Sequence, residues 1–147
     1  NQRILSEGDV LPSNLRLEDY AGKTTQIQEY AGKVLLINFW AAWCAPCLKE
    51  MPGLYSLYQQ TKEKGFETIA ISLDTEQEKS LATLKKMAGD PPFPLFKGSD
   101  QAISDLFPIE GLPYTVIVDR KGVVRYAKPG ERDWASAEAV AFIESLL

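Results

Sequence analysis

The sequence predicts an α/β fold, with a central mixed β-sheet that is covered by helices on both faces. Two observations carry this prediction. Apolar segments of strand length alternate along the chain with segments of helical periodicity, which is the pattern of α/β proteins. The chain then ends in a hairpin pattern that is followed by an amphipathic helix. Because 147 residues suit one hydrophobic core, we expect residues 1–147 to form a single domain.

Three strands are predicted most clearly. Residues 34–40 are almost continuously apolar, as expected for a strand that is buried on both faces. Residues 66–72 form a second predicted strand. Residues 114–118 form a third strand, and a turn sequence at 119–122 connects it to residues 123–127. The last two segments therefore predict an antiparallel hairpin.

The longest predicted helix runs from Cys44 to about Lys64, where Gly65 ends it. One stripe of this helix is apolar and is expected to face the core. The stripe comprises Cys47, Met51, Leu54, Tyr55 and Tyr58. Pro52 lies inside the helix and removes the hydrogen bond to the carbonyl of Leu48, so we expect a kink there.

Two shorter helices complete the pattern. The first begins with a capping-box pattern at Thr75–Glu78 and ends at Gly89. Its apolar side comprises Leu81, Leu84 and Ala88. The second begins after Asp133, which is the expected N-cap. Its buried side comprises Val140, Ile143 and Leu147.

Two regions give weaker patterns. Residues 10–30 contain short alternating segments on either side of a turn at Gly22, which predicts a small N-terminal hairpin. Residues 89–100 are rich in Pro and Gly, which predicts a loop with one short strand. Asp100 is a candidate cap for a short helix over residues 101–107.

Composition and charge limit the classes of function. The net charge is −4 and the 16 Lys and Arg residues are scattered, which gives no basis for nucleic acid or an anionic membrane as a partner. No apolar run approaches the roughly 18 residues of a transmembrane helix. The N-terminus does not have the pattern of a signal peptide, although a leader or anchor removed from the chain is compatible with the sequence.

Both cysteines of the chain lie in the segment NFWAAWCAPCLKEMP, residues 38–52, and are three positions apart. Three interpretations compete: a structural disulfide, a metal site and a redox pair. A disulfide across so short a loop removes little entropy from the unfolded chain and is a poor stabiliser. Structural zinc takes four Cys or His ligands. This chain offers two thiolates and no His, so a carboxylate or a second subunit would have to complete a metal site.

A redox role fits the expected geometry of the pair. Residues i and i+3 of a first helical turn have Cα atoms about 5–6 Å apart, which is within disulfide range. Unpaired N–H groups and the helix dipole at that end stabilise a thiolate. We therefore expect Cys44 to be the exposed, more acidic nucleophile. Cys47 lies one turn further on, on the apolar stripe, and is expected to be the shielded resolving thiol.

The segment FWAAWCAPC followed by LKEMP resembles the active-site segment of the thioredoxin superfamily, and GLPYTVIVD resembles its cis-proline loop and following strand. The N-terminal segment AGKTTQIQEYAGKV and an extra strand–helix insert over roughly residues 72–100 are similar to one branch, the extracytoplasmic TlpA/ResA-like thiol–disulfide oxidoreductases. The resemblance covers nearly the whole chain. It implies a thioredoxin-like fold with an N-terminal hairpin and a central strand–helix insert.

The resemblance also implies roles for individual residues. Cys44 corresponds to the nucleophile and Cys47 to the resolving thiol. Trp43 corresponds to a flat contact surface beside the disulfide. Pro113 corresponds to a cis-proline that faces the sulfur atoms, and the backbone of Leu112 to the segment that pairs with a substrate strand. We therefore expect the peptide bond between Leu112 and Pro113 to be cis.

The chain departs from the related sequences at several positions. Asn38 stands where thioredoxin has a buried aspartate. An asparagine at this position is usual in the TlpA/ResA-like branch. Ala45, beside Pro46 in the substrate-facing turn, stands where some reductases of the branch carry a carboxylate. The sequence Leu-Pro-Tyr at 112–114 differs from the Thr-Pro-Thr often found there. Glu50 has two interpretations: a solvated helix residue, or a group that assists proton transfer at the second cysteine.

We therefore expect a protein thiol–disulfide oxidoreductase that needs no metal and no organic cofactor. The resemblance implies a monomeric reductant outside the cytoplasm, periplasmic or membrane-anchored. Its partners would be protein dithiols or disulfides and a membrane or soluble electron donor. Several such enzymes reduce apocytochromes c before haem attachment. The direction of electron flow depends on the reduction potential, which the sequence alone does not determine.

Two other functions remain open. One is a peroxidase of the peroxiredoxin type, although the residues before Cys44 do not match the Pro-x-x-x-Thr-x-x-Cys pattern of that enzyme class. The other is a non-enzymatic carrier of copper or zinc. Peroxide consumption by the reduced protein would identify the first, and equilibrium dialysis with the metals would identify the second.

Overall fold

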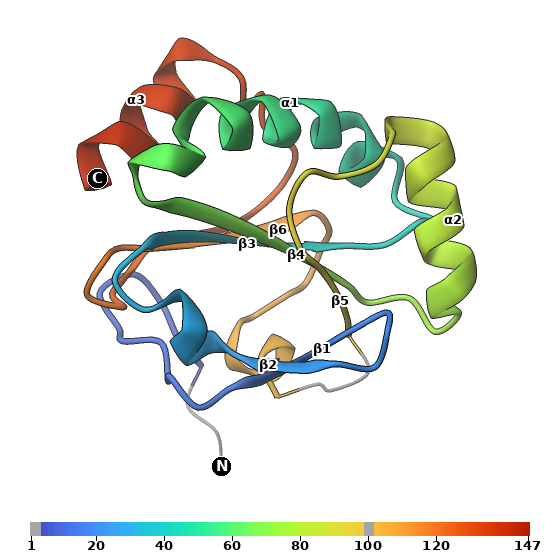
Figure 1. Ribbon diagram of the computed structural model, residues 1–147, viewed down its shortest axis with the longest axis horizontal. Helices are drawn as coiled ribbons and strands as arrows, with labels where there is room; N and C mark the ends of the chain where they lie inside the picture. Colours follow the sequence, from blue (N-terminus) through green and yellow to red (C-terminus); the bar gives the residue numbers. More distant parts are fainter. Residues whose placement is uncertain (1–3, 99–101) are drawn as a thin grey trace.

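The computed structural model describes residues 4–98 and 102–147. It contains one mixed sheet of seven strands in the order β2-β1-β5-β4-β3-β6-β7, which confirms the predicted α/β class (Figure 1). The strands are β1 (Arg16–Asp19), β2 (Thr24–Gln26), β3 (Val34–Trp40), β4 (Phe66–Ser72), β5 (Leu95–Lys97), β6 (Tyr114–Val118) and β7 (Val124–Pro129). The helices are α1 (Ala45–Thr61), α2 (Gln77–Ala88) and α3 (Ala137–Leu146), with the 3-10 helices η1 (Ile27–Tyr30), η2 (Lys62–Lys64) and η3 (Ser104–Leu106).

Strand β3 is the strand from which the cysteine segment leaves the sheet. All of its residues are buried, as its nearly continuously apolar sequence predicts. It runs parallel to β4, where Trp40 pairs with Ser72, and antiparallel to β6, where Phe39 pairs with Tyr114. The chain that follows Trp40 therefore begins beside the end of β4 and the start of β6.

The two faces of the sheet are covered by different kinds of helix (Figure 1). Helices α1, α2 and α3 all contribute side chains to the core on one face, among them Leu54, Leu84 and Ile143. The core on the other face includes Ile27 of η1 and Leu106 of η3, together with N-terminal residues. Helices thus lie on both faces, as predicted, but in the described part of the chain the α-helices share one core.

The weaker sequence patterns also correspond to structure. Strands β1 and β2 form the predicted N-terminal hairpin, and β6 and β7 form the predicted C-terminal one. The short strand expected within residues 89–100 is β5, which pairs parallel to β4 and antiparallel to β1. The short helix expected over 101–107 is reduced to η3, and its candidate cap Asp100 lies outside the described residues.

Helix α1 largely follows the prediction. It begins after its N-cap Cys44, continues through Pro52 and gives way to the 3-10 helix η2 after Thr61. Gly65 then ends the helical segment with a φ of 97°, a left-handed conformation that favours glycine. The kink expected at the internal proline stays a prediction.

Two predicted helix starts are wrong. Helix α2 begins after Glu76 without a side-chain cap, rather than after a capping box at Thr75. The side chain of Gln77 instead turns back and donates to the carbonyls of Ser72, at the end of β4, and of Asp74 in the loop that follows. Helix α3 is capped by the hydroxyl of Ser136 and not by Asp133. The Asp133 carboxylate closes the turn just before the helix.

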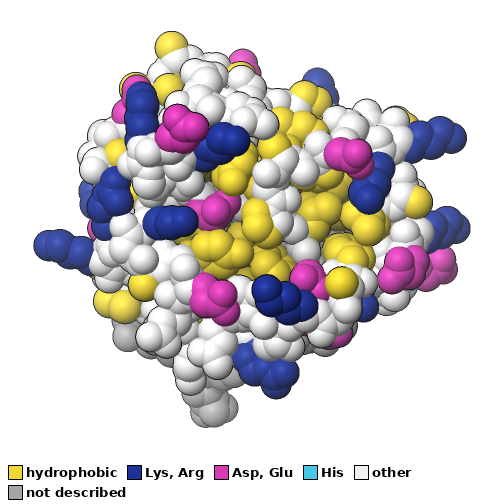
Figure 2. Space-filling view, viewed as in Figure 1, with side chains coloured by type: hydrophobic (Ala, Val, Ile, Leu, Met, Phe, Trp, Pro, Cys, Tyr) yellow, Lys and Arg dark blue, Asp and Glu magenta, His cyan; other side chains and the backbone are white. Residues whose placement is uncertain are grey.

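Charged side chains are dispersed on the face shown in Figure 2. Lys and Arg lie mostly around the outline and are interspersed with Asp and Glu, while hydrophobic side chains lie nearer the middle. This arrangement matches the scattered basic residues of the sequence.

Candidate active site

The two cysteines lie where the chain passes from β3 into α1. Cys44 is the N-cap of the helix, and its Sγ accepts the backbone N–H of Cys47 at 3.2 Å. A disulfide joins the pair, with a Cα–Cα distance of 5.3 Å. The first helical turn therefore holds both sulfur atoms, and one of them takes the place of a capping oxygen.

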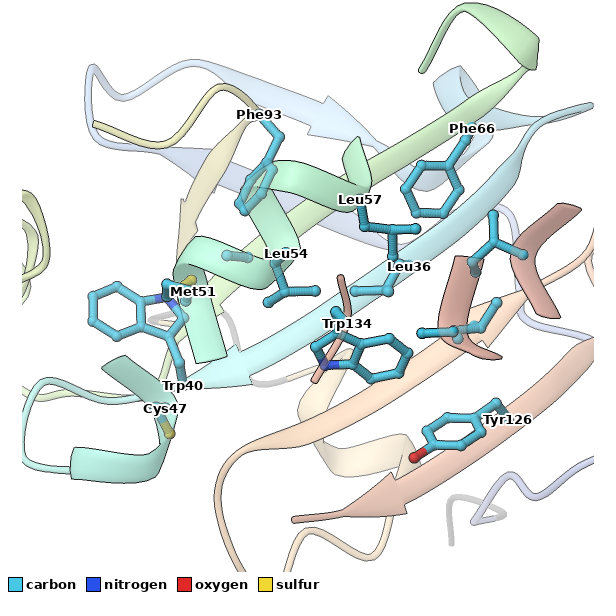
Figure 3. Packing of buried hydrophobic residues seen from close by; sticks show 14 of the residues in the cluster. Leu36, Trp40, Cys47, Met51, Leu54, Leu57, Phe66, Phe93, Tyr126 and Trp134 are labelled. Carbon is cyan, nitrogen blue, oxygen red and sulfur yellow. The ribbon is translucent and has the colours of Figure 1, made fainter. Parts of the chain in front are cut away.

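The prediction that Cys44 is exposed is wrong for this disulfide-bonded state. Its exposed fraction is 4%, and that of Cys47 is 0%. Cys47 lies beside Trp40 at one end of the hydrophobic cluster in Figure 3. The chain around the pair is far more exposed. Trp43 has an exposed fraction of 74%, and Ala45 and Pro46 are also exposed. The backbone turn and its flanking side chains, rather than the sulfur atoms, thus form most of the accessible surface.

The proline segment reaches the same end of the sheet. The Leu112–Pro113 bond is cis, as predicted. Because Phe39 pairs with Tyr114 in antiparallel register, the next step along places Pro113 opposite Trp40, the last residue before the cysteine loop. Pro113 is buried and Leu112 is half-buried, and Leu112 packs against the cores on both faces of the sheet.

Glu50 is not a solvated helix residue, because its exposed fraction is 3%. It lies one turn after Cys47 on α1. Its Oε1 accepts the indole Nε1–H of Trp134 at 2.9 Å and the backbone N–H of Arg132 at 3.3 Å. Its Oε2 accepts the side-chain amide of Asn38 at 3.2 Å. Three elements, β3, α1 and the segment before α3, therefore surround one carboxylate.

Burial raises the pKa of the Glu50 carboxyl to about 7. Loss of solvation penalises the charged form, and this effect exceeds the opposing effect of the hydrogen bonds from Trp134, Arg132 and Asn38. The nearby negative charge of Glu131 raises the pKa further. The arrangement therefore provides an acid that can gain and lose a proton near neutral pH, one helical turn from a cysteine.

Sequence reasoning missed the partners of this carboxylate. Trp134 is 84 positions from Glu50 along the chain, and Thr115, which accepts a bond from the Asn38 amide at 3.4 Å, comes from β6. A tryptophan in a polar segment next to a helix start was the one available signal. It indicated burial, but it did not indicate which residue the indole N–H would reach.

A second carboxylate holds the loop before the cysteines. Asp74 Oδ2 accepts the backbone N–H of Ala42 at 2.8 Å, together with the hydroxyl groups of Ser72 and Ser80. Both hydroxyls are buried, and they also lie 3.0 Å from each other. Asp74 thereby ties the insert between β4 and α2 to the residue just before Trp43. The sequence reasoning did not single out this contact.

Within residues 4–98 and 102–147, no group of three or more His, Cys, Asp or Glu side chains is arranged to hold a metal ion. In the same part of the chain, no helix combines the length and the apolar character needed to cross a membrane.

Comparison with known proteins gives consistent results. The AhpC/TSA family matches residues 8–127. The thiol–disulfide oxidoreductase ResA of Bacillus subtilis is 32% identical over 120 residues, which cover 82% of this chain and 65% of that protein. ResA of Bacillus thuringiensis is 34% identical over 81% of this chain and 68% of its own length. This chain thus spans about two-thirds of the length of these curated relatives.

A solved structure has the same architecture. A thiol:disulfide interchange protein from a Bacteroides species superimposes with a TM-score of 0.76 at 25% identity, over 96% of this chain and 90% of that one. The match extends beyond the cysteine segment to nearly the whole chain. The chain therefore belongs to the AhpC/TSA family and, within it, to the group of ResA-like thiol–disulfide oxidoreductases.

Proposed function

We propose that this chain, folded as one domain, catalyses thiol–disulfide exchange with other proteins, with Cys44 as nucleophile and Cys47 as resolving thiol. The observation that carries the proposal is the bond from the Cys47 N–H to the Cys44 sulfur at the start of α1. In the reduced protein the same N–H and the positive end of the helix would stabilise a thiolate on Cys44. We expect this thiol to be the more acidic of the two.

The reaction proceeds in two exchanges. The Cys44 thiolate attacks a partner disulfide, forms a mixed disulfide and releases the first partner sulfur as a thiolate. Cys47 then loses its proton and attacks the Cys44 sulfur, which releases the second partner sulfur and leaves the enzyme as a disulfide. The partner gains two electrons and the enzyme loses two. The state with the Cys44–Cys47 disulfide is the product of this direction.

Glu50 serves as the proton acceptor for Cys47 in this scheme. The carboxyl lies one helical turn from the thiol, and its pKa of about 7 suits a group that must take a proton and return it. Its burial keeps the charged form from being stabilised by water. The same group would donate the proton back when the enzyme is reduced again.

We assign partner binding to the surface around the cysteines. Exposed Trp43, Ala45 and Pro46 supply an apolar contact area, and the backbone of Leu112 before Pro113 offers polar groups to a partner strand. The proline has no N–H of its own. An uncharged surface of this kind fits an unfolded or extended polypeptide that carries a cysteine pair.

The setting of the reaction also belongs to the proposal. The resemblance to ResA-like proteins supports a reductant outside the cytoplasm that receives electrons from a membrane or soluble donor. It also supports apocytochrome c, whose cysteines must be reduced before haem attachment, as one class of partner. These assignments name the substrate class, and partner identification tests them.

Trapping of mixed disulfides tests the mechanism. Changing Cys47 to Ser keeps the nucleophile and removes the intramolecular attack, whose effective concentration far exceeds that of a free thiol. The C47S variant should accumulate adducts that dithiothreitol releases, and Cys44→Ser should form none. Equal trapping by both variants would contradict the assignment of roles.

Two further measurements separate the proposal from its rivals. Rapid peroxide consumption by the reduced protein, without a protein disulfide as acceptor, would indicate a peroxidase. Stoichiometric retention of copper or zinc in equilibrium dialysis, unchanged by the redox state of the pair, would indicate a metal carrier. We expect neither result.

A further inference from the structure

The hydrogen-bond partners of Glu50 determine which of its two carboxyl oxygens can carry a proton. The two partners of Oε1 are the Trp134 indole and the Arg132 backbone N–H, and each of these groups can only donate. The partner of Oε2 is the Asn38 side-chain amide, which carries an acceptor as well as a donor. A proton on Oε1 would therefore point at two donors, whereas a proton on Oε2 faces a group that can accept it.

In the observed arrangement the Asn38 amide is set up for the ionised carboxylate. Its Nδ2 donates to Glu50 Oε2 at 3.2 Å and to the Thr115 hydroxyl at 3.4 Å. Its Oδ1 is buried and has no hydrogen-bond partner among the described residues. Nearly all buried polar atoms have such partners, so the unpaired oxygen requires an explanation.

Reversal of the amide would give a second arrangement with the same number of bonds. Oδ1 would then face Glu50 Oε2 and the Thr115 hydroxyl, and both of these oxygens can donate when Glu50 is protonated. Nδ2 would move to the position that Oδ1 occupies now. Reversal thus leaves Nδ2 of Asn38 unpaired in place of Oδ1. The protonation state of Glu50 determines in which of the two orientations the amide can form both of its hydrogen bonds, to Glu50 and to Thr115.

We propose that Asn38 is a positioning residue for the redox reaction: its side-chain amide reverses when Glu50 gains or loses a proton, and the proton is held on Oε2. The inference rests on the proposed function, because it takes Glu50 as the proton acceptor for Cys47. The amide lets the buried carboxyl keep its hydrogen bonds in both protonation states. A group that could only donate, in place of the Asn38 amide, would oppose protonation of Glu50.

Charged and titratable groups approach Glu50 from several elements. Lys49 precedes it on α1 and forms an exposed ion pair at 3.6 Å with Glu131, whose charge acts on Glu50. The Arg132 guanidinium stacks on the Trp134 ring, 5.2 Å from its centroid. The cysteines of the same helix do not titrate while they are joined as a disulfide, and the chain has no His. In the oxidised protein, a change near pH 7 in this region is therefore assigned to Glu50.

Nuclear magnetic resonance on the oxidised, full chain tests the proposal. The sequence contains only three asparagines, at positions 1, 14 and 38, so selective ¹⁵N labelling of Asn gives a simple side-chain spectrum. The Asn38 amide signals should move with pH, with the same midpoint as the ¹³C signal of the Glu50 carboxyl. The signals of Asn14, an exposed residue outside this network, should not share that midpoint.

Glu50→Gln provides the decisive comparison. A glutamine can place its oxygen toward the two fixed donors and its NH₂ toward Asn38, which imitates the protonated carboxyl. The Asn38 signals of E50Q should match those of the parent protein at low pH, and should stay there at every pH. Thr68→Val is the matched control. It removes another buried side-chain oxygen, on β4, for which residues 4–98 and 102–147 provide no hydrogen-bond partner. The titration of Asn38 should stay unchanged.

Several outcomes would overturn the inference. It fails if the Asn38 signals stay constant while Glu50 titrates, or if E50Q gives the high-pH signals. The parent titration decides alone if E50Q does not fold. Failure of the proposed function is a separate result. If C47S traps no partner while Asn38 still follows Glu50, the amide reversal stands and the redox role of the site falls.

Discussion

Two carboxylates flank the cysteine turn and are held in different ways. Asp74 contacts the loop before the cysteines. It is half-buried, and its Oδ2 accepts a backbone N–H and two hydroxyls. Glu50 follows the cysteines on α1, is almost fully buried, and accepts three N–H groups spread over its two oxygens.

The difference separates an anchor from an acid. Around Asp74, the donors converge on a single oxygen and fix the loop that carries Trp43. Around Glu50, the loss of solvation exceeds the effect of its donors, so that the pKa rises to about 7. The same chemical group thus holds the site in one place and is suited to exchange a proton in the other. Substitutions at the two positions should have effects of different kinds.

The largest expected effect is on catalysis. Glu50→Gln removes the proposed proton acceptor, so the rate of the second exchange step should fall roughly a hundredfold or more, the usual contribution of general acid–base catalysis. The dependence of the rate on pH near 7 should disappear as well. Single-turnover reduction of a disulfide substrate measures both. Glu63→Gln, an exposed position in η2, is the control, and an equal loss there would rule out a specific role for Glu50.

The next effect concerns stability and pH. Because the pKa of Glu50 is raised on folding, the folded state binds more protons than the unfolded state between about pH 4.5 and 7. The free energy of unfolding should therefore fall as pH rises through this range, by about 3 kcal/mol at most. Denaturant unfolding at several pH values measures this change. E50Q should lack this component, and an identical slope in E50Q and the parent would contradict the assignment.

A smaller effect is expected at the anchor. Asp74→Ala leaves the Ala42 N–H without its acceptor and removes the shared partner of the Ser72 and Ser80 hydroxyls, which should cost roughly 1–3 kcal/mol of folding free energy. Asp74→Asn keeps an acceptor oxygen and should recover most of that loss. Chemical denaturation of both variants tests this. If Asn were as damaging as Ala, the charge rather than the hydrogen-bond geometry would be what matters.

The smallest expected effect concerns Glu131, which acts on the pKa of Glu50 by its charge and not by a hydrogen bond. Glu131 raises the pKa of Glu50 through its charge alone, and its ion pair with Lys49 is exposed. Glu131→Gln should lower the pKa of Glu50 while it changes the free energy of unfolding by less than about 1 kcal/mol, as is usual for surface pairs. Carbon NMR of the Glu50 carboxyl measures the first quantity and denaturation the second. An upward shift of the pKa would show that the two charges do not face each other as described.

Much of the fold follows from local sequence patterns. The nearly continuously apolar residues of β3 predicted a strand buried on both faces, and the turn at 119–122 predicted the hairpin of β6 and β7. The spacing of Cys44 and Cys47 predicted a pair within one helical turn. Each of these features depends on neighbouring residues only, so period and turn chemistry suffice to identify it.

Other features depended on the tertiary structure. The starts of α2 and α3 were misplaced because the polar side chains near them bond locally in other ways: Gln77 donates back to the carbonyls of Ser72 and Asp74, and Asp133 closes the turn before Ser136 caps α3. Cys44 proved buried because the disulfide packs against the core. The bonds from Ala42 to Asp74 and from Trp134 to Glu50 join residues 32 and 84 positions apart. A side chain's partner across such a distance depends on how the sheet and helices pack. The sequence by itself therefore determined that Glu50 follows the cysteine pair on one helix, while only the folded chain decided that its carboxylate is buried among donors, which sets its pKa.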